Sequence, residues 1–111
     1  MAFNNEIEIN GRKIGPGHPV YIIAEMSANH GQDLEQAKAL VRAAKEAGAD
    51  AIKLQSYTAD TLTMDCQLPH FEATGPWKGQ YLHDLYKSAY MPWEFHKPLI
   101  ELATELSITI F

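Results

Sequence analysis

Cysteine is nearly absent from this chain: Cys66 is the only one among 111 residues. A single cysteine excludes a disulfide within the chain and fits a reducing compartment, and nothing around Cys66 suggests a catalytic thiol. The chain also lacks any apolar run near the roughly 18–20 residues that a membrane-spanning helix needs. Its N-terminus, MAFNNEIEIN, has neither the basic start nor the apolar stretch of a signal peptide. We therefore expect a cytoplasmic protein with no membrane partner.

Basic residues are also scarce, with 9 Lys and Arg against 14 Asp and Glu and a net charge of −5. No cationic stripe is available to neutralise phosphates, which argues against a nucleic-acid partner. Glycine motifs that cradle phosphate are missing too, since the sequence contains neither GxGxxG nor a P-loop. Four of the five histidines are not spaced as the ligands of a metal site are. We therefore expect no metal ligand from His18, His70, His83 or His96.

A hairpin signal is the first feature that the sequence does contain. Asn10-Gly11 lies between short alternating runs in residues 7–14, and both residues tolerate the positive φ of a tight hairpin turn. Pro16 and Pro19 then interrupt the pattern. We predict a short β-hairpin followed by an irregular lead-in.

A strand, a helix and a second strand are predicted next. Residues 21–27 and 51–56 have the composition and length of buried strands. Between them, Asp33 is the expected helix N-cap, with Gln36 three residues later as in a capping box, and Gly48 is the expected C-terminal stop. Such a unit within about 35 residues implies parallel strands joined by a right-handed crossover.

The second half of the chain is less regular. Residues 57–90 are too long to be a mere spacer, because structureless connections beyond about 15 residues are uncommon and usually functional or disordered. Within them we predict a short helix with one face made of Leu82, Leu85, Tyr86 and Ala89. Another helix should follow Pro92, with Pro98 kinking it or delaying its start. Its apolar stripe is Phe95, Leu99, Leu102 and Leu106. Residues 108–111 read as a third strand.

Three strands and two main helices in this order do not close a sheet. A complete (β/α)8 barrel needs eight strands and typically about 250 residues, and a sheet of three strands leaves unpaired edges. We therefore expect an α/β fold that is the N-terminal portion of a TIM barrel. Residues 1–20 would be the hairpin and lead-in, and residues 21–111 the incomplete barrel of a longer protein.

Three polar side chains are expected on the inner face of that barrel. Side chains alternate along a strand, so Glu25 faces away from Ala24 and Met26 in the first strand. By the same alternation Lys53 and Gln55 lie together in the second strand. Buried charges at the carboxyl ends of barrel strands are candidates for an active site. The alternative is an internal Glu–Lys pair that only fills the barrel.

Two loop segments are further candidates. Asn29 and His30 follow the first strand and could orient a substrate or Glu25, although His30 could instead cap the next helix or face solvent. Trp77, Lys78 and Tyr81 lie in the long loop, either as a lid that contacts a sugar or as a cluster that only packs on the barrel.

The segments IIAEMSANH (22–30) and AKEAGADAIKLQSYTADTLT (44–63) resemble the opening of the sialic acid synthase family. The order Ala-Glu, Asn-His and Ala-Gly-Ala-Asp-Ala-x-Lys-x-Gln is specific. Within the family, WKGQYLHDLYKSAYMPWEFHKP (77–98) looks like the pseudaminic acid branch. The resemblance extends over residues 7–111 and implies a (β/α) barrel with a small C-terminal antifreeze-like domain in the parent enzyme.

The resemblance implies a transferase that condenses phosphoenolpyruvate with an N-acylated amino sugar, 2,4-diacetamido-2,4,6-trideoxy-altrose, giving pseudaminic acid and phosphate. Glu25 would be the catalytic residue that moves a proton or positions water, and Lys53 would bind phosphoenolpyruvate as a point charge. The sugar contacts that we expect are Asn29, His30, Gln55, Tyr57, Trp77, Lys78 and Tyr81.

A cofactor and a partner follow from the same resemblance. A divalent metal, commonly manganese, is implied as the Lewis acid, with histidine ligands from later strands and none in this segment. The Ser-Thr-Pro stretch that binds phosphate would begin directly after Phe111, and the parent enzyme would be a homodimer. One departure from the family is Ser107, where a glycine is usual, at a position suited to positive φ.

Other interpretations stay open. The substrate could be N-acetylmannosamine, as in N-acetylneuraminate synthases. Lys53 could be the Schiff-base lysine of a pyruvate aldolase-type barrel, which borohydride would trap. A non-catalytic, truncated association module is also possible, with sheet edges paired between copies. In the favoured interpretation the segment alone is inactive.

Overall fold

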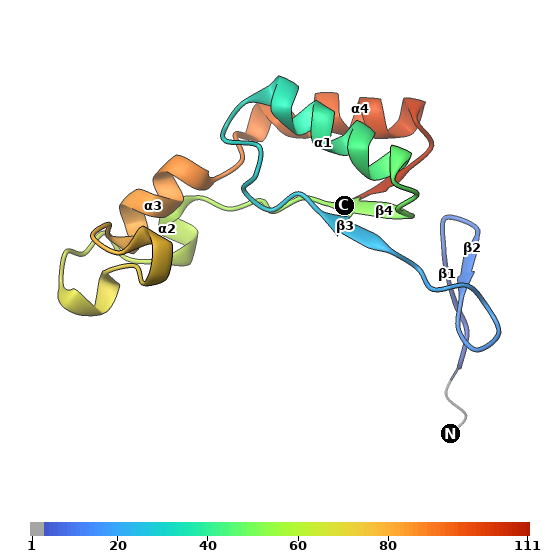
Figure 1. The fold of residues 1–111 in the computed structure, drawn as a ribbon, viewed down its shortest axis with the longest axis horizontal. Coiled ribbons are helices and arrows are strands. Elements are labelled where there is room, and N and C mark those ends of the chain that lie inside the picture. The colour runs from blue at the N-terminus through green and yellow to red at the C-terminus, as the bar shows by residue number, and fades with distance from the viewer. Residues whose placement is uncertain (1–3) are drawn as a thin grey trace.

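The N-terminal hairpin lies at one end of the molecule in the computed structural model, which describes residues 4–111 (Figure 1). Residues 1–3, the start of the predicted lead-in, lie outside the described residues. Strands β1 (Ile7–Ile9) and β2 (Arg12–Ile14) pair antiparallel. Asn10 and Gly11 between them have φ values of +46° and +79°, as a two-residue turn with positive φ at both positions requires. The predicted hairpin is confirmed.

Three parallel strands form the sheet at the centre of the molecule. Their order is β3 (Ile23–Glu25), β4 (Ala51–Lys53) and β5 (Thr109–Ile110), with Glu25 opposite Lys53 in the register. The hairpin lies at the amino ends of these strands, where the Asn10 side chain donates a 3.0 Å hydrogen bond to the Thr109 hydroxyl. Each strand is shorter than predicted, because an apolar run shows which residues can be buried and not how far the neighbouring strand continues beside them.

Two helices cover one face of this sheet (Figure 1). Helix α1 (Leu34–Glu46) begins at the predicted cap, where the Asp33 carboxylate accepts from the backbone N–H groups of Glu35 and Gln36, and Gly48 follows its end with φ of +86°. Helix α4 (His96–Glu105) follows a 3-10 turn, η3 (Trp93–Phe95).

Prolines set the start of α4. Pro92 precedes the 3-10 turn, and Pro98 lies in the first turn of the α-helix, where its missing N–H costs no helical hydrogen bond. The predicted delay of this helix is therefore confirmed.

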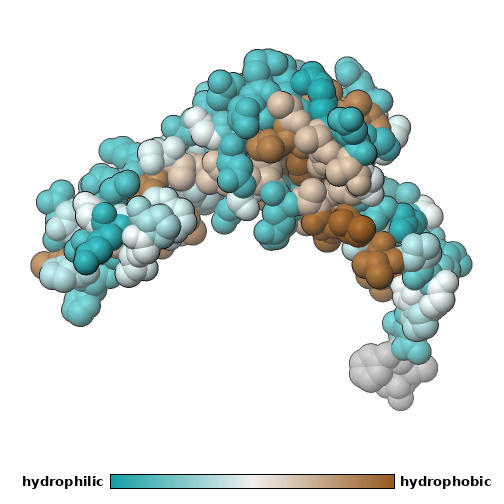
Figure 2. Space-filling view, viewed as in Figure 1, coloured by the Kyte–Doolittle hydropathy of each residue, from teal (hydrophilic) through white to brown (hydrophobic). Residues whose placement is uncertain are grey.

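The core lies between the helices and the apolar face of the sheet. Met26 and Ile52 are buried on the sheet side, and Val41 of α1 and Leu99 of α4 are fully buried against them. This confirms the predicted alternation, since the polar face carrying Glu25 is the opposite one. On that opposite face no element among residues 4–111 covers the sheet. Ile23, which alternates onto the same face as Glu25, is 44% exposed, and apolar surface is visible on the side of the molecule away from the helices (Figure 2).

The segment between β4 and η3 projects beyond the carboxyl ends of the strands, and we call residues 57–90 the arm (Figure 1). It contains α2 (Ala59–Leu62), two 3-10 turns, η1 (Pro69–Phe71) and η2 (Gly75–Trp77), and α3 (Leu82–Ala89). The short helix predicted here is confirmed as α3. Helix α2 and the 3-10 turns were not predicted, because an element of a single turn shows no hydrophobic periodicity.

A hydrogen bond joins the two helices of the arm. His83 of α3 is buried, and its Nε2 lies 2.8 Å from Oδ1 of Asp60 on α2. At the tip, the Ala73 N–H donates to the Gln80 carbonyl over 2.8 Å. The arm is therefore an ordered unit with its own internal bonds. None of the helices in residues 4–111 has both the length and the apolarity to cross a bilayer.

Candidate active site

An ion pair marks the carboxyl ends of the two neighbouring strands. Nζ of Lys53 lies 3.1 Å from Oε1 of Glu25, its register partner across the sheet. The side chains remain 49% and 60% exposed, so the burial that we predicted for this pair is not found within residues 4–111. The physical reason is that no described element lies over this face of the sheet.

A small polar pocket surrounds the pair. It encloses about 140 Å³ and is lined by Glu25, Ser27, Lys53, Leu54 and Gln55. An ammonium, a carboxylate and a carboxamide therefore border one space. The ammonium can bind an anion. If an anion replaces Glu25 as the partner of Lys53, the Glu25 carboxylate is free to accept a proton.

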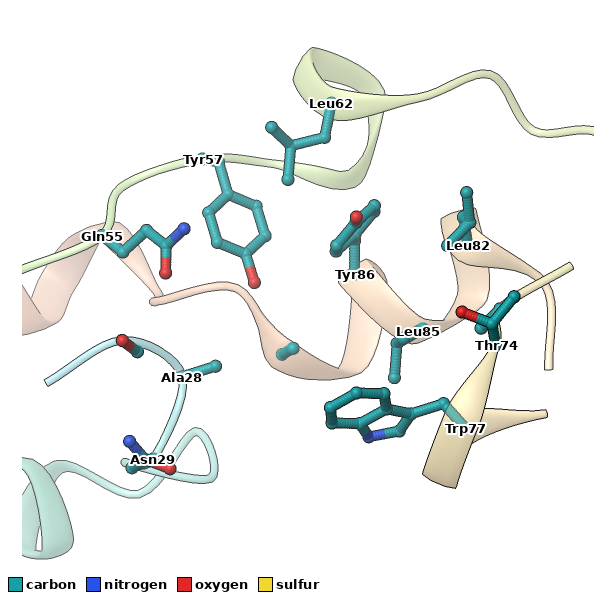
Figure 3. A pocket seen from close by; sticks show the side chains of 13 residues that line it. Ala28, Asn29, Gln55, Tyr57, Leu62, Thr74, Trp77, Leu82, Leu85 and Tyr86 are labelled. Carbon is teal, nitrogen blue, oxygen red and sulfur yellow. The ribbon is translucent and has the colours of Figure 1, made fainter. Parts of the chain in front are cut away.

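A larger cavity of about 730 Å³ adjoins this pocket, because Ser27 and Gln55 line both. It lies between the loops after β3 and β4 and the arm (Figure 3). Its lining residues are Ser27, Ala28, Asn29, Gln55, Tyr57, Leu62, Ala73, Thr74, Trp77, Leu82, Leu85, Tyr86 and Ala89. None of these described residues carries a charge, so the cavity suits a neutral part of a ligand.

The polar and aromatic groups of the cavity are held in place locally. The Asn29 side chain donates a 3.0 Å hydrogen bond to the Met26 carbonyl at the end of β3. Tyr57 is buried and packs edge-to-face on Tyr86, with ring centroids 5.9 Å apart. Burial, with a smaller contribution from Tyr86, raises the pKa of the Tyr57 phenol. Tyr57 is thus a neutral hydroxyl at any physiological pH.

The structure brings only part of the predicted sugar contacts together. Asn29, Gln55, Tyr57 and Trp77 line the cavity. Lys78 and Tyr81 lie in the tip of the arm outside this lining, where the Lys78 N–H bonds the Gly75 carbonyl and Tyr81 pairs with Glu72 in a bridge. Turn η2 places Trp77 in the wall of the cavity, whereas Lys78, which follows it, is exposed and outside the lining.

His30 is buried and does not line the cavity. It is 1% exposed, its Nδ1 accepts a 2.9 Å hydrogen bond from the Gln32 N–H, and its ring meets Phe95 edge-on. Burial lowers the pKa of His30, so the ring is neutral near pH 7. The solvent-facing alternative is wrong, and the ring supports the loop after β3.

Several residues of the cavity were not predicted as site residues. Leu82, Leu85 and Tyr86 belong to the predicted face of α3 and line the cavity, but the sequence patterns assigned them no role in a site. The sequence signal that could have found them is that no second helix was predicted to cover the apolar face of α3. In the structure, only the four-residue α2 packs beside this eight-residue helix. Part of such a face stays open to a ligand.

No group of three His, Cys, Asp or Glu side chains within residues 4–111 is arranged to hold a metal ion. Two of the histidines that we did not expect to bind a metal each contact one polar side chain. His18 lies 2.6 Å from Glu6, and His96 bonds the Ser56 hydroxyl.

Comparisons with known proteins identify relatives of the chain. The model of the NeuB family matches residues 40–111. Pseudaminic acid synthase of Campylobacter jejuni is 46% identical over 93 residues, which are 83% of this chain and 27% of the relative. The corresponding enzyme of Helicobacter pylori is 45% identical over 94 residues. Human N-acetylneuraminate-9-phosphate synthase is 53% identical over 45 residues, or 40% of this chain.

Solved structures show the same fold. The N-acetylneuraminic acid synthetase of Leptospira borgpetersenii superimposes with a TM-score of 0.76 and 30% identity over 96% of this chain and 33% of its own. The spore coat polysaccharide biosynthesis protein SpsE of Bacillus subtilis gives a TM-score of 0.67 and 33% identity, covering 96% of this chain and 26% of its own. The predicted α/β barrel portion is thereby confirmed. The chain spans about a quarter of the length of the relatives it matches, and it belongs to the NeuB family.

Proposed function

We propose that this chain is the N-terminal part of a synthase that condenses phosphoenolpyruvate with 2,4-diacetamido-2,4,6-trideoxy-altrose to give pseudaminic acid and phosphate. The observation that carries the proposal is the Glu25–Lys53 pair at the strand ends, beside an uncharged cavity. The identity to pseudaminic acid synthases over 83% of this chain supports the choice of product.

In the proposed reaction, Lys53 binds an anionic group of phosphoenolpyruvate. Carbon 3 of phosphoenolpyruvate attacks the aldehyde carbon of the sugar, and the aldehyde oxygen takes up a proton. Water then adds to the oxocarbenium carbon, and phosphate leaves. Glu25, released from Lys53 by the incoming anion, is placed to take the proton of that water.

Gln55 connects the two halves of the site. Because it lines both the charged pocket and the cavity, its carboxamide suits the reacting end of the sugar. Asn29 and Tyr57 would contact the sugar from the cavity side. His30 would act only by supporting the loop that carries Asn29, and Lys78 and Tyr81 have no contact with the cavity in this proposal.

The expected manganese has no ligand set among the described residues, so no step is assigned to it here. The homodimer and the cytoplasmic location stay predictions. The Schiff-base alternative for Lys53 is distinguished by whether borohydride traps a pyruvate adduct.

The test measures phosphate release from phosphoenolpyruvate by the full-length enzyme in which we place this chain, with manganese supplied. The diacetamido sugar, N-acetylmannosamine and a reaction without sugar are compared. We expect release only with the diacetamido sugar. Lys53→Ala should lower kcat/KM by at least about 100-fold, because it removes a charge that binds the reacting anion.

Lys97→Ala is the matched control, since Lys97 is a highly exposed lysine on α4 and should leave the rate unchanged. Release with N-acetylmannosamine alone would move the enzyme to the N-acetylneuraminate branch. Undiminished release by Lys53→Ala would contradict the assigned role of the lysine, and a pyruvate adduct trapped by borohydride would support the aldolase instead.

A further inference from the structure

The cavity next to the Glu25–Lys53 pocket has two chemically different sides. The strand loops supply the polar side, with Ser27, Asn29 and Gln55. The arm supplies a largely carbon surface, in which Leu85 and Tyr86 of α3 face the space and the indole of Trp77 lies beside Leu85 (Figure 3). A ligand that fits must therefore be polar on one side and apolar on the other.

The charges of the lining residues limit the ligands that the cavity can accept. No lining residue of the cavity within residues 4–111 is charged, whereas the adjoining pocket holds both Glu25 and Lys53. A phosphate or carboxylate is thus attracted to the small pocket and finds no counter-charge in the cavity. A sugar that carries a phosphate on its far end would be poorly accommodated.

The place where the charged pocket joins the cavity determines which end of the sugar contacts the arm. Gln55 and Ser27 join the cavity to the charged pocket, so the aldehyde end of the sugar lies there in the proposed reaction. The carbon surface of the arm lies on the opposite side of the cavity (Figure 3). A hydroxyl placed against it would lose its water without gaining a hydrogen bond, whereas an acetyl methyl group would gain apolar contact.

We propose that the arm determines which sugar is accepted, with Trp77, Leu85 and Tyr86 binding the methyl of the 4-acetamido group. The inference rests on the proposed function and specifies its substrate class, a neutral sugar acylated far from its aldehyde. Trp77 is the best probe, because its side chain is exposed and its loss leaves the core intact: it is 53% exposed in this structure.

The experiment compares two sugars with the full-length enzyme. One is the diacetamido sugar, and the other is its analogue with a hydroxyl in place of the 4-acetamido group. The wild-type enzyme should prefer the acylated sugar in kcat/KM. Trp77→Ala and, as a second variant, Leu85→Ala should reduce this preference at least tenfold through KM for the sugar, with KM for phosphoenolpyruvate unchanged and Trp77→Phe retaining most of the preference.

Trp93→Ala is the matched control, because Trp93 is similarly exposed at 57% but lies outside the cavity lining. It should keep the wild-type preference. An active wild-type enzyme whose preference survives both Trp77→Ala and Leu85→Ala would overturn the inference and leave the proposed function standing. A wild-type enzyme that releases no phosphate with either sugar would overturn both.

Discussion

Ser107 ends α4 in a conformation that suits glycine better than serine. Its φ is +53°, and its carbonyl accepts a 3.2 Å hydrogen bond from Lys45. A Cβ in the left-handed region meets its own backbone, which costs an ordinary residue about 1–2 kcal/mol. Ser107, which replaces the glycine that is usual in the family, therefore lies at a strained position.

We expect Ser107→Gly to raise the free energy of unfolding by about 0.5–1 kcal/mol, because the relieved strain exceeds the extra chain entropy of glycine. Urea denaturation of the full-length protein measures this. Ser88→Gly, inside α3, is the control and should destabilise by about 0.5–1 kcal/mol. A loss of stability in Ser107→Gly would show that the left-handed position carries no strain.

His30 makes the fold sensitive to acid. Burial lowers its pKa below the usual value of about 6.5, and protonation of Nδ1 would break the bond it accepts from the Gln32 N–H. The neutral ring is favoured in the folded state, so its contribution to stability is complete above pH 6.5 and is lost as the pH falls below that value. The loop after β3 should weaken first.

We therefore expect the free energy of unfolding to fall between pH 7.5 and pH 5.5 in the wild type, and to fall less in His30→Gln. Urea titrations at the two pH values measure the difference. His70→Gln, which changes an exposed histidine of the arm, should behave as the wild type. Equal pH dependence in wild type and His30→Gln would remove His30 as the cause.

At the scale of elements, the hydrogen bond between His83 and Asp60 holds α2 to α3. His83 is buried, whereas the Asp60 side chain is almost fully exposed. Solvent screens the charge of Asp60, so the bond acts mainly by satisfying the buried ring nitrogen. Both helices line the cavity, through Leu62 and Tyr86 among others. Loss of the His83–Asp60 hydrogen bond would therefore make the part of the cavity lining formed by α2 and α3 less ordered.

Asp60→Ala should raise the amide hydrogen-exchange rates of residues 59–62 and 82–89 about tenfold while leaving β3, β4 and α1 unchanged, because locally bonded units open independently. Exchange read by mass spectrometry tests this. Asp84→Ala, on the exposed side of α3, is the control. A uniform rise over the whole chain would indicate global destabilisation instead.

Sequence patterns predicted elements where local chemistry is sufficient. Asn10-Gly11 identified the hairpin, Asp33 and Gly48 bounded α1, and Pro98 indicated the late start of α4. Alternation placed Glu25 and Lys53 on one face. The exposure of these two side chains depends on which element covers that face. Whether Trp77 or Lys78 lines the cavity depends on a single 3-10 turn, η2. Neither leaves a periodic signal in the sequence.

At the scale of the molecule, one face of the sheet is open. Val20 and Ile22, in the segment that leads into β3, are exposed at 80% and 56%, and both outer strands, β3 and β5, have a free edge among the described residues. Apolar surface and unpaired strand edges of this kind drive association. In the proposed parent enzyme the remaining barrel strands would cover them.

Residues 1–111 expressed alone should therefore self-associate and release no phosphate from phosphoenolpyruvate. Sedimentation velocity measures the association, which the double change Val20→Lys and Ile22→Lys should reduce. Lys substitution at Glu94 and Glu101, on the helical side, controls for added charge. A stable monomer of the unchanged segment would show that the open face is tolerated in water.

The hydrogen bond between Asn10 and Thr109 joins groups 99 positions apart. A ribosome has therefore to release almost all of this segment before the hairpin finds its final contact. The turn itself is local and can form within microseconds of emerging, but its attachment to the sheet awaits β5. The hairpin can thus form early, but it can bond the amino end of the sheet only after the third strand has been synthesised.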